Sequence, residues 1–200
     1  MTVQLQANKA FDAQDIERLV QDHQVHRDVY TSQDVYALEM QHLFANVWVF
    51  VGHESQTPKH GDYFTTQIGS QPVIQVRHSD SKIKVLHNRC PHKGTKIAID
   101  RHGNTGTFFR CPYHAWSFET DGRLKAVPLE SGYSNTSFET TENANGIKPV
   151  GAVHNHRGFV FARLADSGIS FDDFFGDSLS SIDNMVDRSP EGRLEVAGPP

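Results

Sequence analysis

Two short segments of the sequence each carry one cysteine and one histidine behind a proline. They are Arg89-Cys90-Pro91-His92 and Arg110-Cys111-Pro112-Tyr113-His114, and they begin 21 residues apart. Each follows a β-type segment, and the proline stiffens each loop by fixing φ. The combined pattern is C-x-H, 18 intervening residues, then C-x-x-H. Two such loops can converge on one point and offer two thiolates and two imidazoles there.

Four interpretations of this pattern compete. A chance pairing is disfavoured because both loops repeat the same flanking residues. A disulfide between the only two cysteines of the chain leaves both histidines unexplained, and a reducing cytoplasm disfavours it. A tetrahedral Cys₂His₂ zinc site is a fair rival, although zinc knuckles usually place two cysteines in one loop and two histidines in the other. A two-iron, two-sulfide cluster needs one cysteine and one histidine from each loop, which this sequence supplies.

The composition indicates a globular protein. The 200 residues are enough to bury a core, with 37% hydrophobic and 10% aromatic residues. Nineteen Lys and Arg against 24 Asp and Glu leave a net charge of −5, and no basic stretch is long enough to bind phosphates, so no nucleic-acid partner is expected. The longest apolar run, Val47 to Val51, is too short to span a bilayer. Since residues 1–10 carry no export signal, we expect a cytoplasmic protein without a membrane partner.

The chain before the loops is predicted to be helical. Asp12 is the expected cap of a short helix that carries Ile16, Leu19 and Val20 on one face. Ser32 is the expected cap of a second helix, in which Val35, Leu38 and residues 40–44 recur at helical spacing. Residues 1–46 are therefore predicted to be a helical lead-in.

From Val47 onward the pattern changes to short β-type segments, which must position the two loops. The expected strands are Val47–Gly52, Asp62–Ile68, Pro72–Arg77, Lys82–His87, Thr105–Arg110, Trp116–Glu119, Arg123–Val127, Ile147–Val153 and Gly158–Leu164. The expected turns are Gly69-Ser70, Ser79-Asp80, Gly103-Asn104 and Asp121-Gly122, the last as a type I′ hairpin turn. Strands this short imply stacked antiparallel sheets, so the fold class is mostly β, with one domain over residues 47–165.

Two polar stretches complete the chain. Residues 131–146 hold few apolar side chains and are predicted to be a surface loop. Residues 166–187 carry six Asp together with apolar residues at helical spacing, which predicts an acidic amphipathic helix that covers the sheet or docks a partner. Residues 166–200 are expected to lead toward a catalytic domain that these 200 residues do not contain.

The motif Cys90-Pro-His92-Lys93-Gly94 with Cys111-Pro-Tyr113-His114-Ala-Trp116 resembles the Rieske [2Fe–2S] motif of ring-hydroxylating oxygenases. The resemblance runs from about residue 27 to the end of the chain. Its further signs are Trp48, Gly61-Asp62-Tyr63, Asn88-Arg89 and Asp121-Gly122. The spacing between His92 and Cys111 is one residue longer than the common form, and the extra residue is placed in the expected turn at 103–106.

The resemblance implies a set of site residues. Cys90 and Cys111 would hold the inner ferric ion, and His92 and His114 the outer one. The residues around these ligands are Lys93, Gly94, Thr95, Tyr113, Ala115 and Trp116. Backbone N–H groups around Lys93–Thr95 and Ala115–Trp116 are candidate donors to the sulfides.

The resemblance also implies a role as the Rieske portion of an aromatic-ring-hydroxylating dioxygenase α subunit. Electrons would come from NAD(P)H through a reductase, with or without a ferredoxin, and pass to a mononuclear non-haem Fe(II) that activates O₂ in a neighbouring subunit. The family implies a homotrimer or an α₃β₃ hexamer and an aromatic substrate, such as a phthalate-, benzoate- or salicylate-type acid. The close histidine pairs outside the motif, His23 with His26 and His154 with His156, lack the downstream carboxylate of such an iron site, so no catalytic residue is expected in this chain.

Other Rieske-bearing and metal-binding classes account less well for the chain. A respiratory Rieske protein would have two further loop cysteines, whereas the matching neighbourhood here holds Gly94 and Tyr113 and no cysteine is left over. Two other classes are a stand-alone Rieske ferredoxin-type carrier and a nitrite-reductase small subunit. Neither class explains the helical lead-in and the acidic tail of this chain. A structural zinc-binding interaction domain is the weaker alternative.

Overall fold

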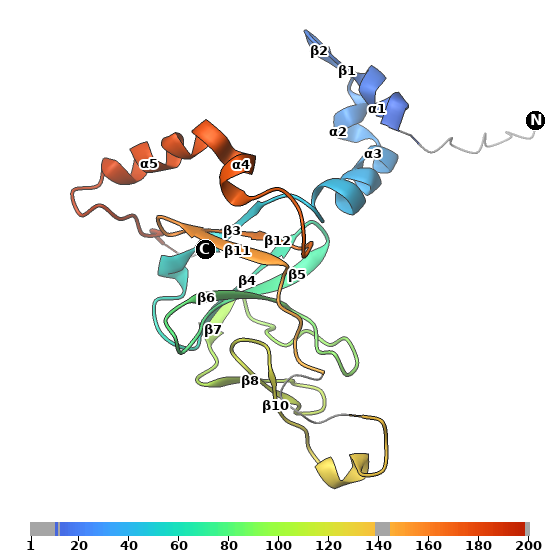
Figure 1. Cartoon of the computed structure of the whole chain (residues 1–200), viewed down its shortest axis with the longest axis vertical. Coiled ribbons are helices and arrows are strands. Elements are labelled where there is room, and N and C mark those ends of the chain that lie inside the picture. Colours follow the sequence, from blue (N-terminus) through green and yellow to red (C-terminus); the bar gives the residue numbers. More distant parts are fainter. Residues whose placement is uncertain (1–10, 12, 139–144, 199–200) are drawn as a thin grey trace, which may run out of the picture. The chain divides into compact units, whose positions relative to one another are not determined.

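The computed structural model describes residues 11, 13–138 and 145–198, which fall into two units divided between Phe44 and Ala45 (Figure 1). The smaller unit is a run of short helices interrupted by one small hairpin. Its elements in chain order are α1 (Ala13–Leu19), β1 (Val20–Gln21), β2 (Gln24–Val25), α2 (Asp28–Thr31), α3 (Gln33–Leu38) and the π-helical turn η1 (Glu39–Leu43).

The sequence predicted most of this smaller unit. The Ser32 side chain accepts a hydrogen bond from the Val35 N–H at the start of α3, so the expected cap is confirmed. Val35 is also buried, as its helical spacing predicted. The prediction for Val20 is wrong, because this residue pairs with Val25 in the small hairpin instead of extending α1. The expected cap at Asp12 lies outside the described residues.

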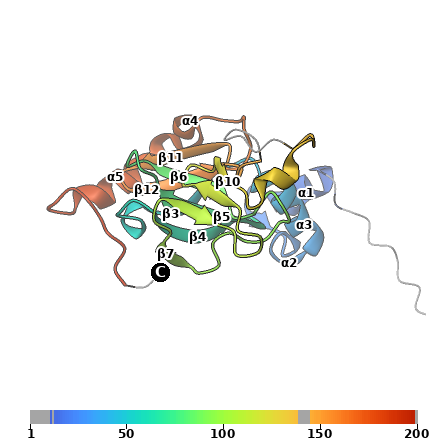
Figure 2. The ribbon, with the colours of Figure 1, turned by 90° about the horizontal axis from the view of Figure 1, so that it is seen from below.

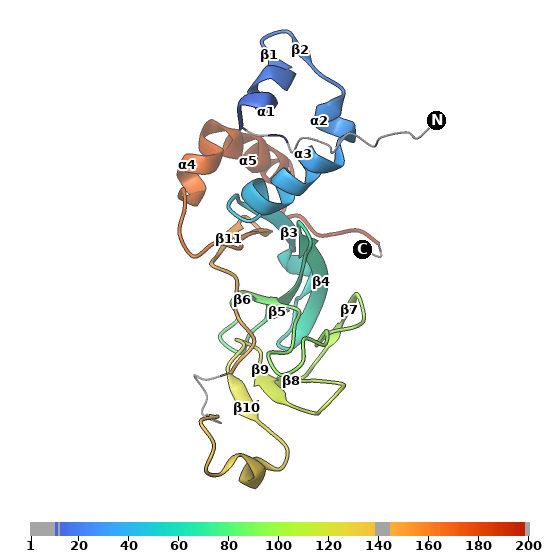
Figure 3. The ribbon, with the colours of Figure 1, turned by 90° about the vertical axis from the view of Figure 1, so that its right-hand side faces the viewer.

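The larger unit contains three antiparallel sheets (Figures 2 and 3), so the expected fold class is confirmed. The four-stranded sheet has the order β6-β5-β4-β7 and consists of β4 (Asp62–Ile68), β5 (Gln71–Arg77), β6 (Ile83–His87) and β7 (His102–Asn104). A second sheet, β11-β12-β3, consists of β3 (Val49–His53), β11 (Ala152–His156) and β12 (Phe159–Arg163). The third, β10-β9-β8, consists of β8 (Phe108–Arg110), β9 (Ser117–Glu119) and β10 (Leu124–Ala126).

The core of the larger unit has two main parts. One lies between the first two sheets and contains Val51, Ile68, Val73, Val85, Val150, Val160 and Ala162. The other joins the four-stranded sheet to the small third sheet, and it includes Ile74, Leu86 and Phe118 together with both cysteines. The two thiols are therefore part of the hydrophobic core and not of a surface turn.

Two predicted assignments, one turn and one strand, are wrong. Gly103-Asn104 is not a turn but part of β7, which pairs with Asp62 and Tyr63 of β4. The strand expected at 147–153 begins only at Ala152, and before it Pro149 makes one isolated bridge to β6. In both cases the conformation depends on pairing with a strand that is distant in sequence. Local propensity does not predict such pairing.

The hairpin between β9 and β10 is present, but its turn is not type I′. The Gly122 N–H donates to the Glu119 carbonyl and the Glu119 N–H to the Arg123 carbonyl, which defines a three-residue loop. Within this loop, only Gly122 has positive φ, at 98°. A type I′ turn needs positive φ at two residues, so this loop belongs to the three-residue class with glycine in its last position.

The acidic tail forms two helices rather than one. α4 (Phe171–Phe175) and α5 (Leu179–Asp187) are separated by Gly176, with φ of 48°, and the 3₁₀ turn η4 (Gly176–Ser178). Phe171 is buried against Trp48 and Phe161, with ring centroids 5.4 and 5.3 Å away. The tail therefore covers the β11-β12-β3 sheet, which was one of its two expected roles. None of the helices in the described ranges combines the length and the apolar character needed to cross a membrane.

Replacing Phe171 by alanine tests this attachment. The variant Phe171→Ala should lower the free energy of unfolding by about 3 kcal/mol, because it leaves a cavity among the rings of Trp48, Phe161 and Phe175. Urea denaturation followed by tryptophan fluorescence measures the change. The control Phe174→Ala removes a ring of the same helix that is 38% exposed and should cost less than about 1 kcal/mol. Equal losses in the two variants would contradict this packing.

Candidate metal centre

A buried asparagine fixes the first cysteine loop, which we call loop 1 (residues 88–95). Asn88 follows β6 directly and is only 3% exposed. Its amide nitrogen donates to the Ala98 carbonyl at 2.7 Å, and its amide oxygen accepts the N–H groups of Ile97 and Ala98 at 2.9 and 3.0 Å. These three bonds hold the beginning of the loop against the irregular segment at residues 97 and 98, so they fix the backbone that leads into Cys90.

Loop 1 closes on itself with two backbone hydrogen bonds. The Cys90 N–H donates to the Thr95 carbonyl at 2.8 Å, and the Gly94 N–H donates to the Cys90 carbonyl at 2.9 Å. Gly94 adopts φ of 75°, a conformation that glycine accepts without strain. A Cβ atom at Gly94 would also lie 3.3 Å from the Arg89 side chain.

The second cysteine loop, loop 2 (residues 111–116), repeats this closure in the β8–β9 hairpin. The Cys111 N–H donates to the Trp116 carbonyl at 2.8 Å, and the Ala115 N–H donates to the Cys111 carbonyl at 3.0 Å. Ala115 has φ of 59° and thus occupies the position that Gly94 holds in loop 1. The repeat seen in the sequence is therefore a structural repeat, although only loop 2 is the tip of a hairpin. Loop 1 connects β6 to β7, which are not neighbours in their sheet.

The two closures bring the thiols together inside the core. Cys90 and Cys111 are each 2% exposed and belong to the same core cluster. Burial and, less strongly, the nearby Cys111 side chain raise the pKa of the Cys90 thiol, while the N–H groups of His92 and Lys93, which point at its sulfur, act in the opposite direction. These two N–H groups would stabilise a thiolate once a cation displaces the proton.

The two imidazoles lie toward the surface from the thiols. The His92 and His114 rings have centroids 4.7 Å apart, with His92 half-buried and His114 exposed. The His92 ring stacks on Trp116 at 4.7 Å and 3° between the planes. Its Nδ1 atom is buried and finds no hydrogen-bond partner among the described residues, although a buried polar atom normally has one. A metal ion is a partner that would satisfy this atom.

The arrangement fits a two-iron cluster better than a single tetrahedral ion. The two thiols lie in the core, whereas the two imidazoles lie nearer the surface. A zinc site of this type would need all four side chains around one point. A [2Fe–2S] cluster needs only two protein ligands per iron, with the thiolates and the imidazoles on different irons.

An aromatic cover over loop 2 was not predicted. Trp116 is 3% exposed, and the rings of Phe138 and Tyr133 lie 5.3 and 6.4 Å from it. Both rings come from the segment after β10, which includes the 3₁₀ turn η3 (Glu130–Tyr133). Residues 131–138 thus do more than form a polar surface loop. The two aromatic residues in this otherwise polar stretch were the signal available in the sequence.

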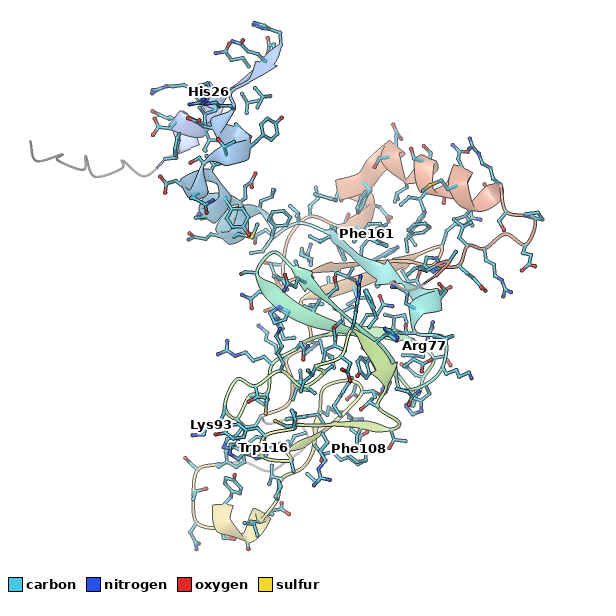
Figure 4. All side chains as sticks on the ribbon, turned by 180° about the vertical axis from the view of Figure 1, so that it is seen from behind. His26, Arg77, Lys93, Phe108, Trp116 and Phe161 are labelled. Carbon is cyan, nitrogen blue, oxygen red and sulfur yellow. The ribbon has the colours of Figure 1, made fainter. Side chains whose placement is uncertain are left out.

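Within the part of the chain that the structure describes, the other histidine pairs do not belong to a group of three or more possible metal ligands. His156 does contact a carboxylate, Asp183, at 2.8 Å, but His154 instead stacks on Phe171 with centroids 3.8 Å apart. In the smaller unit, His26 accepts a hydrogen bond from the Asp28 N–H. Figure 4 shows Lys93 of loop 1 and Trp116 of loop 2 at one end of the larger unit and Phe161 at the other.

Comparison with known proteins gives one family match and many relatives. The family described as "Rieske [2Fe-2S] domain" matches residues 47–140. The chain is 37% identical over 172 residues to toluate 1,2-dioxygenase subunit alpha from Pseudomonas putida, which covers 85% of this chain and 37% of that protein. It is 37% identical over 175 residues to the anthranilate 1,2-dioxygenase large subunit from Acinetobacter baylyi, covering 87% and 36%.

Among solved structures, naphthalene 1,2-dioxygenase from a Rhodococcus species, bound to indole, is similar with a TM-score of 0.80 and 30% identity. The match covers 92% of this chain and 40% of that one. The chain therefore spans well under half the length of the relatives it matches.

The Asn88 bonds can be tested by truncation. The variant Asn88→Ala should lower the free energy of unfolding by about 3 kcal/mol, because it leaves three buried backbone groups without partners. Asn104→Ala is the matched control, since Asn104 also makes three hydrogen bonds but is exposed, so water can replace them. Urea denaturation compares the two. If Asn88→Ala proves as mild as the control, the loop is not held by this side chain.

Proposed function

Residues 47–140 of this chain are a Rieske [2Fe–2S] domain related to those of Rieske oxygenase α subunits, and from this premise we propose that the chain is the electron-transfer portion of an aromatic-ring-hydroxylating dioxygenase. It would take electrons from a reductase or a ferredoxin and deliver them to a mononuclear non-haem Fe(II) site that activates O₂ and lies outside these 200 residues. The observation that carries the proposal is the pair of buried thiols in one core cluster together with two imidazoles 4.7 Å apart nearer the surface, all four from two loops with the same closure.

We assign Cys90 and Cys111 as ligands of the inner iron and His92 and His114 as ligands of the outer iron. When bound, a Rieske cluster accepts and releases one electron at a higher potential than an all-cysteine cluster, because neutral imidazoles replace two thiolates. The burial of the two cysteines and the exposure of His114 support this order. The orphaned Nδ1 of His92 supports the assignment of that ring.

The neighbouring residues of this chain orient the four ligands. Trp116 stacks flat on His92 and, with Phe138 and Tyr133 behind it, prevents that ring from turning. The N–H groups of His92 and Lys93 place positive dipoles on the Cys90 sulfur. Such donors favour the reduced, more negative state of a cluster and so raise its potential. The N–H groups of Gly94 and Ala115 instead donate to the carbonyls of Cys90 and Cys111 and so close the two loops.

The relatives support an oxygenase over a stand-alone carrier. Their similarity to this chain extends over 85% to 98% of its length, beyond the 94 residues from 47 to 140, and thus includes the surroundings of the Rieske domain. Two of the relatives are named for toluate and anthranilate, so we propose an aromatic carboxylate as the substrate class.

The assembly and location complete the proposal. Relatives named as alpha subunits support an oligomer, for which we propose a homotrimer or an α₃β₃ hexamer. In such an assembly the electron would cross to the iron of a neighbouring subunit. We also propose a cytoplasmic location, where a reducing environment keeps both cysteines available as ligands.

Replacing one outer ligand tests the assignment. The variant His114→Ala should abolish the Rieske-type EPR signal of the dithionite-reduced protein, because one iron loses a protein ligand. The change should also lower the content of iron and acid-labile sulfide per chain. His102→Ala, which removes an exposed histidine on β7, should leave the signal and both contents unchanged. A normal Rieske spectrum in His114→Ala would eliminate this ligand assignment.

A further inference from the structure

A groove of about 860 Å³ runs along loop 1, beside the proposed cluster ligands. It is formed by the Gly69-Ser70 turn, the start of β5, the end of β6, loop 1 and residues 146–148. Six of its lining residues have basic side chains: His87, Arg89, His92, Lys93, Lys96 and Lys148. Among the described residues, no Asp or Glu lines it.

The positive charge of this groove contrasts with the rest of the chain. The protein carries a net charge of −5, yet four of its 19 Lys and Arg residues lie on this one surface. Among the described residues, only Lys148 of these four has an acidic partner, Asp166 at 4.0 Å, and both of those side chains are exposed. The positive charge of Lys148, after burial, also contributes to the lowered pKa of His87 inside the groove. The groove is thus a local region of positive potential on an acidic protein.

The shape of the groove favours a protein over a small anion. Arg89, Lys93, Lys96 and Lys148 are all exposed, and they come from separate points along the rim. A site for a small anion would need converging donors that are shielded from water, whereas a spread of exposed charges suits a broad surface of opposite sign.

A second copy of this chain is less suited to the groove. Its acidic residues concentrate in the tail, but three of these carboxylates already have partners in the same chain. Asp183 and Asp187 pair with Arg157, and Asp166 pairs with Lys148.

We propose that this groove is the docking surface for an acidic electron-donor protein. The inference rests on the proposed function, since Cys90 and His92 line the same groove and a donor seated there lies directly beside the proposed cluster. Because the remainder of the chain is acidic, an acidic donor is repelled elsewhere and attracted here, so the charge pattern orients the encounter as well as accelerating it.

A charge-reversal experiment tests the groove. The probe is an acidic plant-type [2Fe–2S] ferredoxin, chemically reduced and mixed by stopped flow with the oxidised wild-type protein or with the Lys96→Glu/Lys148→Glu variant. At low ionic strength the variant should be reduced about tenfold more slowly, within the range that electrostatic steering spans. The difference should vanish at high salt, because the charges are then screened. The methyl viologen radical cation should reduce the variant at least as fast as the wild type.

A second charge reversal separates a local groove from net charge. Lys59→Glu/Lys82→Glu changes the net charge by the same amount, but its residues lie by the far ends of β4 and β6, away from the groove. This control should retain the wild-type rate with ferredoxin. Equal slowing in both variants would overturn the proposal, as would no slowing in Lys96→Glu/Lys148→Glu. Loss of self-association in that variant with an unchanged ferredoxin rate would assign the groove to a second copy and also overturn it.

The proposed function and the groove can fail independently. EPR of the Lys96→Glu/Lys148→Glu variant should match that of the wild type, since neither side chain is a proposed ligand. If the wild type held no cluster, the proposed function would fail. Calorimetric titration with oxidised ferredoxin would then still test the groove. Salt-sensitive binding that is lost in Lys96→Glu/Lys148→Glu but kept in Lys59→Glu/Lys82→Glu would support the proposed docking surface. Absence of binding to the wild type would overturn it.

Discussion

The side-by-side burial of two thiols at the ends of two separate loops is the constraint on which the rest of this structure depends. Cys90 and Cys111 are almost fully buried and reach each other from different sheets. Packing in an apolar core does not by itself fix the positions of two thiols relative to each other. Backbone hydrogen bonds within each loop fix them instead. Each cysteine donates its N–H to the residue five positions later and accepts from the residue four positions later. The positive φ at those fourth positions, and the Asn88 bonds that anchor loop 1, follow from the same requirement.

The four proposed ligands become less buried from the two thiols to the two imidazoles. The thiols lie in the core, His92 is half-buried against Trp116, and His114 is exposed. Negative charge from thiolates would thus lie where N–H dipoles can stabilise it, while the neutral imidazoles lie where an electron can enter and leave. The basic groove also lies along loop 1, so a donor bound there, as we propose, would be next to the cluster that receives its electron.

The sequence predicted the parts of the fold that local chemistry determines. The two Cys-Pro loops, the Ser32 cap and the longer strands β4, β5 and β6 all lie where residue type and spacing placed them. Features set by distant contacts were missed. β7 exists because it pairs with β4, α4 and α5 separate at Gly176 as they pack on the sheet, and Tyr133 and Phe138 cover Trp116 from a stretch that reads as polar. The groove was equally invisible, because its charges come from positions 89, 93, 96 and 148, which only the fold brings together.

The content of iron and acid-labile sulfide, measured together with the EPR spectrum of the dithionite-reduced protein, tests the central claim most directly. The account predicts two irons and two sulfides per chain and the low average g value of a cluster with mixed cysteine and histidine ligands. One zinc ion and no sulfide would contradict it. The same four side chains would then serve as structural ligands, and the redox role, with the oxygenase that depends on it, would be lost.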